Sequence, residues 1–278
     1  MPDIIVRVKT KEQFRCIPET KAIRTLIVDA SCLDLIKQKK KEEKDRKYYL
    51  QFPDILKESK AGLQEALLQE AENFDGLVVR NFDQLGLLRS FQKEGGRIPE
   101  IIGDSFLYSY NPEALAFYRD FFPAIRWVLS DELTDKEAQN LIKKADTDDF
   151  IYKVYGYQTL MVTNQCIRRN YQGCRKGEPE PLRFTDEKNN AFYAVNDCTN
   201  CYNLIYNGQP TMMLDKLQYK EDRFFVDGTE YPSLLIDFTI EKENEIAQIL
   251  GLVEKILKSE PVVLEGNYTR GHHYKGVE

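Results

Sequence analysis

Residues 76–110, GLVVRNFDQLGLLRSFQKEGGRIPEIIGDSFLYSY, decide the fold class, because a strand, a helix and a second strand follow one another directly. The run GLVVRN at 76–81 is apolar without strict alternation, which is typical of a parallel strand buried on both faces. Residues 82–95 predict a helix that Gly95 and Gly96 stop. Residues 100–110 begin as another apolar strand. This unit predicts a parallel α/β fold.

The same unit recurs along the whole chain. Strands are predicted at 3–10, 25–30, 48–53, 76–81, 100–110, 124–133, 150–161 and 231–239. Helices are predicted at 11–19, 31–47, 60–74, 82–95, 111–122, 134–146 and 242–259. Two helix starts carry capping signals: Asn111 stands before Pro112, and Thr134 stands three residues before Glu137.

Eight strands in this arrangement predict a (β/α)8 TIM-like barrel, with an open doubly wound sheet as the alternative. The absence of a phosphate-binding glycine fingerprint after the first strand favours the barrel. A chain of 278 residues can form one such barrel, so we expect a single domain over 1–278. Residues 161–232 are then a long insertion between strands seven and eight, and residues 259–278 a C-terminal tail. Because barrel active sites lie where that insertion leaves, at the carboxyl ends of the strands, we expect it to be functional.

Barrel geometry nominates the polar residues and strand-end positions on that face as site candidates. They are Asp29, Asp54, Arg80, Asn81, Asp104, Tyr108, Asn111, Asp131, Glu132, Gly156 and Tyr157. Asp104 is the best acid candidate, since it follows apolar residues in the predicted fifth strand, where an unpaired charge is costly. A structural carboxylate with a partner is the alternative.

Four of the six cysteines gather in the insertion as Cys166, Cys174, Cys198 and Cys201. Four thiolates in two short-spaced pairs suit zinc or an iron–sulfur cluster, and spacing does not separate the two. The alternatives are two disulfides, a redox CxxC pair or unrelated thiols. The first residues, MPDIIVRVKT, lack the apolar core of a secretory signal, so we expect a reduced cytoplasmic setting. Cys16 and Cys32 are interpreted as ordinary thiols.

Charge and hydropathy limit the partners. The formal charge of −6 argues against a surface that binds nucleic acid throughout, and no apolar run approaches the length of a membrane span. Four basic residues nevertheless surround two of the cysteines: Arg168, Arg169, Arg175 and Lys176. They predict either stabilisation of thiolates or an anionic substrate, and a solvated basic loop is the alternative.

Four stretches resemble one family. They are GDSFLYSYNPEALAFYRDFFPAIRWVLSDELTDKEAQNLIKKA at 103–145, VYGYQTLMVTNQC at 154–166, CTNCYNLIYNGQPTMML at 198–214 and YTRGHHYKGVE at 268–278. Together they resemble the peptidase U32 family, a collagenase-like group found mainly in bacteria. The resemblance implies a TIM barrel and a 4Fe–4S cluster on Cys166, Cys174, Cys198 and Cys201. It also implies that Asp104, Glu132, Arg270 and His272 lie near the catalytic site.

The resemblance leaves the reaction open between two enzyme classes. The family name implies a peptidase, yet the chain contains neither HExxH nor GxSxG. Several members hydroxylate an RNA base or a quinone precursor, taking oxygen from a donor such as prephenate. For such substrates Arg168 and Arg169 would hold phosphate or carboxylate groups, and Tyr157 or Tyr202 would stack on a ring.

The resemblance is closest to the second half of long, two-part family members. The expected partner is therefore the N-terminal half of a longer protein. A third function class follows from this, in which the chain is a non-catalytic docking half with a structural cluster.

Overall fold

The computed structural model describes residues 3–43, 45–55, 57, 61–122, 125–145, 147, 149–174, 177 and 180–276. Eight parallel strands form its centre: β1 (Asp3–Val8), β2 (Ile23–Asp29), β3 (Lys47–Gln51), β4 (Gly76–Val79), β5 (Glu100–Gly103), β6 (Ile125–Val128), β7 (Phe150–Gly156) and β16 (Ser233–Asp237). They pair in that order, β16 pairs with both β7 and β1, and the β6–β7 pairing closes the ring. The predicted TIM-like barrel is confirmed, and the open sheet was the wrong alternative.

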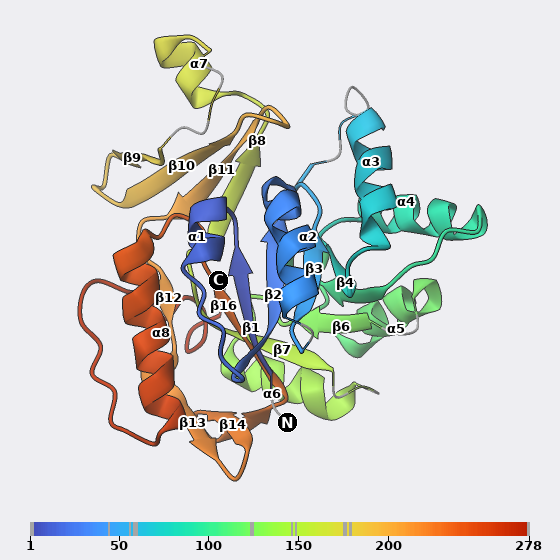
Figure 1. The fold of residues 1–278 in the computed structure, drawn as a ribbon. Coiled ribbons are helices and arrows are strands. Elements are labelled where there is room, and N and C mark those ends of the chain that lie inside the picture. Colours follow the sequence, from blue (N-terminus) through green and yellow to red (C-terminus); the bar gives the residue numbers. More distant parts are fainter. Residues whose placement is uncertain are drawn as a thin grey trace.

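Helices cover the outside of the barrel (Figure 1). They are α1 (Lys11–Arg15), α2 (Leu33–Glu42), α3 (Ala61–Ala71), α4 (Phe82–Lys93), α5 (Pro112–Phe121), α6 (Asp135–Lys144) and α8 (Glu243–Leu257). Both predicted caps are confirmed. The Asn111 side chain accepts a hydrogen bond from the Ala114 N–H at 2.8 Å, and Thr134 forms a capping box with Glu137. Within the described part of the chain, no helix is long and apolar enough to cross a membrane.

The seventh strand is shorter than predicted. It ends at Gly156 rather than at residue 161, so the insertion starts at Tyr157. Gly156 has a φ of +152°, and a Cβ there would lie 2.8 Å from the Asp237 carbonyl oxygen. A side chain is thus excluded sterically where the chain turns out of the barrel.

The insertion contains two small antiparallel sheets and one helix, none of which the sequence patterns predicted. Its elements are β8 (Thr159–Thr163), α7 (Ile167–Gln172), β9 (Leu182–Thr185), β10 (Ala191–Asp197), β11 (Tyr202–Asn207), β12 (Thr211–Met212), β13 (Leu217–Lys220), β14 (Arg223–Val226) and β15 (Thr229–Tyr231). Strands β8, β11, β10 and β9 form the lid sheet in that order, whereas β13, β14 and β15 form the other sheet. Figure 1 shows the lid sheet at one end of the barrel and the β13–β14 hairpin at the opposite end. Three short 3-10 helices, Ala30–Cys32, Ser105–Leu107 and Leu214–Lys216, complete the described elements.

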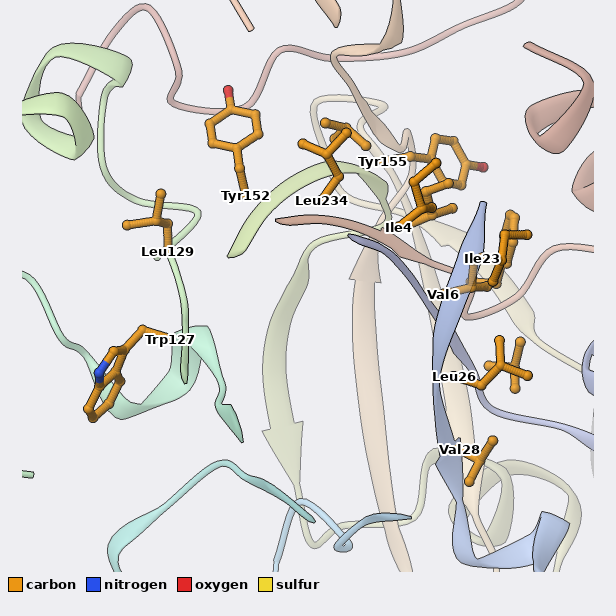
Figure 2. Close-up of a cluster of buried hydrophobic side chains, with 14 of the residues drawn as sticks. Ile4, Val6, Ile23, Leu26, Val28, Trp127, Leu129, Tyr152, Tyr155 and Leu234 are labelled. Atoms are coloured by element: carbon orange, nitrogen blue, oxygen red, sulfur yellow. The ribbon is translucent and has the colours of Figure 1, made fainter. Parts of the chain in front are cut away.

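Apolar side chains pack on both faces of the barrel wall. Ile4, Leu26, Trp127, Tyr152 and Leu234 belong to the outer layer, beneath the helices (Figure 2). The inner layer takes one residue from each barrel strand: Ile5, Ile27, Tyr49, Val78, Ile102, Val128, Ile151 and Leu235.

A polar layer lies directly above this inner apolar layer. Side chains alternate across a strand, so the residue two positions onward points into the same interior, nearer the carboxyl end. Those residues are Arg7, Asp29, Gln51, Arg80, Asp104, Ser130, Lys153 and Asp237. We call this end of the barrel the mouth. The change from apolar to polar in every strand marks the mouth as the place for chemistry.

Candidate active site

Two arginines and three aspartates form a buried ionic network across the mouth. The Arg7 guanidinium on β1 lies 3.2 Å from the Asp104 carboxylate and 3.1 Å from that of Asp237. Arg80, after β4, contacts Asp104 through Nε at 2.9 Å and also pairs with Asp54. Because β1 and β5 are not neighbours, the Arg7–Asp104 pair spans the barrel interior.

The sequence suggested that Asp104 lies inside a strand, but the structure places it after the strand. Strand β5 ends at Gly103, and the Asp104 side chain caps the 3-10 turn Ser105–Leu107 by accepting from the Ser105 N–H at 2.9 Å. Burial alone would raise the pKa of Asp104, but the Arg7 and Arg80 guanidiniums outweigh it and hold that pKa well below its ordinary value. Asp104 is thus an ionised carboxylate at neutral pH, suited to holding cations in place rather than donating a proton.

Two lysines add to the charge of the mouth. Lys153 on β7 is buried and pairs with Asp131, which follows β6. Lys9, just beyond β1, is partly exposed. Desolvation is the main cause that lowers its pKa to about 8, and Arg80 and Arg7 lower it further.

The lid sheet covers the mouth through one face of β11. Tyr202, Leu204 and Tyr206 are buried there and pack with Ile55, Tyr157 and Ile240, which follow three different barrel strands. The Asp54 N–H donates to the Tyr202 hydroxyl at 2.9 Å, and that hydroxyl donates to the Asp54 carboxylate at 3.2 Å. Burial raises the pKa of Tyr206, and Arg80, Asp237 and Arg7 all act on it electrostatically. The tyrosine therefore lies against the ionic network.

Tyr157 and Tyr202, the two predicted stacking residues, both belong to this lid contact. The Tyr157 ring meets Tyr193 edge-on, at 5.8 Å between centroids and 86° between planes. Tyr202 is buried, so its ring is not open to a ligand while the lid sheet is in this position.

The four insertion cysteines lie in two places: Cys166 and Cys174 flank α7, and Cys198 and Cys201 lie in the turn between β10 and β11. Cys166 caps α7, and its sulfur accepts hydrogen bonds from the Arg169 N–H at 3.4 Å and the Asn196 side-chain amide at 3.1 Å. Cys198 and Cys201 bracket the tight β10–β11 turn, where Cys201 has a φ of +56°. Burial raises the pKa of Cys198, as do the neighbouring Cys166 and Cys174 thiols. The Cys166 and Cys174 thiols therefore lie within electrostatic reach of Cys198.

The donor set suits a thiolate-bound metal centre by its chemistry. Two N–H groups directed at one sulfur stabilise a thiolate, and all six cysteines of the chain are unpaired, so neither alternative disulfide is present. The geometry is less complete. Among the described residues, no three His, Cys, Asp or Glu side chains converge closely enough to hold a metal ion. The four-cysteine ligand set thus remains a prediction.

The predicted basic group is only partly described. Arg168 and Arg169 lie on α7 beside Cys166, with Arg169 exposed and Arg168 donating to the Glu180 carbonyl oxygen. The Arg168 Nε is buried and has no hydrogen-bond partner. Arg175 and Lys176 lie outside the described residues. The two described arginines therefore lie next to Cys166 on α7, and not inside the mouth.

Glu132 lies outside the barrel interior. Its carboxylate accepts a hydrogen bond from the Tyr110 hydroxyl at 2.7 Å, and both residues line an open cleft of about 460 Å³ between the starts of α5 and α6. Glu137, Lys144 and Gly276 line the same cleft. The cleft thus lies beside the mouth, and Glu132 and Asp104 belong to separate sites.

The C-terminal tail is fixed along the outside of β7 and α6. Arg270 forms a two-armed ion pair with Asp215, at 2.6 and 2.7 Å, and is not directed at the mouth. His273 is buried, and its Nδ1 lies 3.0 Å from both the Tyr152 hydroxyl and the Asp135 carboxylate. His272 is only half-buried. The histidine that anchors the tail is thus His273, whereas the sequence prediction named His272.

The sequence reasoning missed Arg7, Lys153 and Asp237 because it examined strand ends instead of strand interiors. The signal was present as a repeated apolar-x-polar step, seen in Ile5-Val6-Arg7 and in Leu235-Ile236-Asp237.

No family model, curated protein or solved structure matches the chain. The function must therefore be argued from the geometry and from the sequence resemblance.

Proposed function

We propose that the chain is an enzyme of the peptidase U32 family that hydroxylates or otherwise modifies RNA or a small aromatic substrate at the barrel mouth. One observation carries the proposal: the lid sheet, whose β10–β11 turn holds Cys198 and Cys201, is also the sheet that closes the mouth. Cys201 is followed directly by Tyr202, whose hydroxyl contacts Asp54 at the end of β3. A structural change at Cys201 can therefore reach the ionic network through Tyr202 and Asp54.

The ionic network supports a catalytic rather than a structural use of the mouth. Buried ion pairs contribute little to stability, since desolvation offsets most of their attraction. Charges fixed in place before the substrate arrives stabilise charge that develops in a transition state. Arg7, Arg80 and Lys153 would orient an oxygen-bearing substrate, and the lid sheet would exclude water from it.

The substrate class follows from the face that surrounds the cysteines. The exposed guanidinium of Arg169, beside Arg168 on α7, suits phosphate or carboxylate groups. Tyr157 and Tyr202 would offer rings for stacking if the lid sheet opened. Phosphate on RNA and carboxylate on a small aromatic acid share this chemistry.

The proposed cofactor is a 4Fe–4S cluster held by Cys166, Cys174, Cys198 and Cys201, with zinc as the alternative. A bound cluster would supply electron transfer beside the mouth. The free thiols suit a reducing, cytoplasmic compartment.

The hydrolase alternative has weaker support. Neither histidine makes a hydrogen bond with a serine or cysteine in the described part of the chain, so neither is placed to activate such a nucleophile.

Exposed apolar side chains favour a second candidate, the docking half of a longer protein. Leu160 and Met161 on β8 and Phe184 on β9 are exposed at the two edges of the lid sheet. Apolar groups at open sheet edges are typical of surfaces that bind another chain, here an N-terminal half.

The test is a search for an added oxygen atom. Anaerobically purified protein is incubated with bacterial RNA, or with a small aromatic acid, together with prephenate, and the products are analysed by mass spectrometry. We expect one oxygen to be gained, and the gain to be lost in Cys198→Ser and retained in Cys16→Ser, which alters a thiol directly after α1. Unchanged products with metal-loaded protein would contradict the hydroxylase proposal and favour the docking half.

A further inference from the structure

Lys9 differs from the other cations of the mouth because its charged group has no partner among the residues that the structure describes. Arg7 pairs with Asp104 and Asp237, Arg80 with Asp54 and Asp104, and Lys153 with Asp131. The Lys9 ammonium makes no hydrogen bond or ion pair with any described residue. The residue is also partly exposed rather than fully buried.

Asp29 is the closest carboxylate along the neighbouring strand. The β1–β2 register pairs Val8 with Val28, which makes Lys9 and Asp29 the next step on both strands. The Ser31 hydroxyl links the segments that follow β1 and β2 by donating to the Lys9 carbonyl oxygen at 3.3 Å. The Asp29 carboxylate in turn accepts from the Ser31 N–H at 2.9 Å. Both side chains therefore stand at the same corner of the mouth.

Desolvation, rather than the surrounding charges, mainly favours a neutral amine at Lys9. Desolvation lowers its pKa to about 8, helped by Arg80 on β4 and Arg7 on β1, while Asp29 on β2 and Asp237 on β16 act in the opposite direction. With a pKa near 8, about one amine in ten is unprotonated at pH 7. Burial raises the pKa of Asp29, and Asp197 of the lid sheet adds to that rise, whereas Lys9 and Ser31 lower it. The pKa values of Lys9 and Asp29 are thus shifted toward each other, as a pair that exchanges a proton requires.

We propose that Lys9 is a nucleophilic amine that forms an imine with an aldehyde or ketone at the barrel mouth, with Asp29 moving the proton. The amine nitrogen adds to the carbonyl carbon, forming a C–N bond and a carbinolamine. The carbon–oxygen bond then breaks, and the oxygen leaves as water with the two amine hydrogens, one of them passed through the Asp29 carboxyl. No electron is gained or lost, so the step needs no redox partner.

The test uses 2,4-pentanedione, which captures a neutral amine as an enaminone with loss of water. The full-length protein is treated at about pH 7.5, digested and mapped by mass spectrometry. We expect Lys9 to be labelled about tenfold faster than the exposed Lys21, because the lowered pKa of Lys9 leaves its amine more often neutral at this pH. The labelling rate at Lys9 should level off above about pH 8, near its pKa.

Two variants sharpen the result. Lys9→Arg should remove the fast label while the protein keeps its melting temperature. Asp29→Asn should move the midpoint of the pH profile downward, because it removes a carboxylate that raises the pKa of Lys9. Labelling of Lys9 no faster than Lys21, or a rate that rises steadily past pH 10, would overturn the proposal.

The label needs no metal and no RNA. Its failure is therefore distinguishable from failure of the hydroxylase proposal, which depends on the cysteines.

Discussion

The Arg7 guanidinium on β1 contacts the Asp104 carboxylate after β5, 3.2 Å away across the barrel. Both side chains are almost completely buried. This pair is the centre of a network that also includes Arg80, Asp54 and Asp237. It joins strands on opposite sides of the ring.

Asp104→Asn should therefore destabilise the protein strongly. The substitution keeps the side chain's volume but leaves two buried guanidiniums short of negative charge, which costs about 3 kcal/mol or more. Urea unfolding measures the loss. The exposed Arg223–Glu230 pair is the control, and Arg223→Ala should cost less than about 1 kcal/mol. Equal losses in the two variants would show that the network is not a special feature of the mouth.

Gly156→Ala should destabilise the protein, because a Cβ would lie 2.8 Å from the Asp237 carbonyl oxygen at a backbone with φ of +152°. We expect a loss of more than about 1 kcal/mol. Gly86→Ala is the matched control, since Gly86 lies on α4 with open space around it and alanine favours a helix by about 0.5–1 kcal/mol. Thermal melts should therefore shift in opposite directions, and shifts of the same sign would refute the steric explanation.

Glu241 predicts a pH dependence of stability. Burial raises its pKa to about 7, although its carboxylate accepts hydrogen bonds from the Thr239 and Ile240 N–H groups at 2.5 and 2.9 Å. The ordinary pKa of glutamate is about 4.3, so between that pH and about 7 the folded state binds more protons than the unfolded state. This contribution to stability therefore falls as the pH rises through that window.

Glu241→Gln should remove that contribution, since an amide stays neutral. Between about pH 5 and about pH 8 the stability of the natural protein should fall relative to the variant by of order 3 kcal/mol. Urea unfolding at both pH values gives the difference. A pH-independent difference would mean that Glu241 titrates normally in the folded protein.

The two adjacent histidines should behave differently. His273→Ala removes the contacts with Tyr152 and Asp135, so it should cost about 1–3 kcal/mol and speed hydrogen exchange in residues 262–276. His272→Ala should leave both unchanged because that side chain is half-exposed. If His272→Ala loosens the tail as much as His273→Ala, the anchor has been assigned to the wrong residue.

The barrel could be predicted from the sequence because each unit carries local signals. Apolar runs such as Gly76–Val79 and caps such as Thr134 are signals that extend over only a few residues. The number of predicted strands then indicated a closed barrel. The lid sheet could not be predicted in this way. Strands such as β9 are exposed along their whole length, and the alternation in Leu182–Thr185 covers only four residues, which is too short to identify a strand.

The site was predictable only in part, because its contacts join distant residues. Asp104 was found as an isolated acid, but its partners Arg7 and Arg80 come from other strands. The choice between His272 and His273 depends on which side chain meets Tyr152, and nothing in the two identical residue types distinguishes them.

The most direct test of the central claim is a metal analysis of the anaerobically purified full chain. Visible absorption with iron, sulfide and zinc determination should be made on the natural protein, on Cys198→Ser and on Cys16→Ser. A cluster on the four insertion cysteines predicts a brown protein with about four iron and four sulfide per chain, retained in Cys16→Ser and lost in Cys198→Ser. A colourless protein with one zinc, or with no metal, would contradict it.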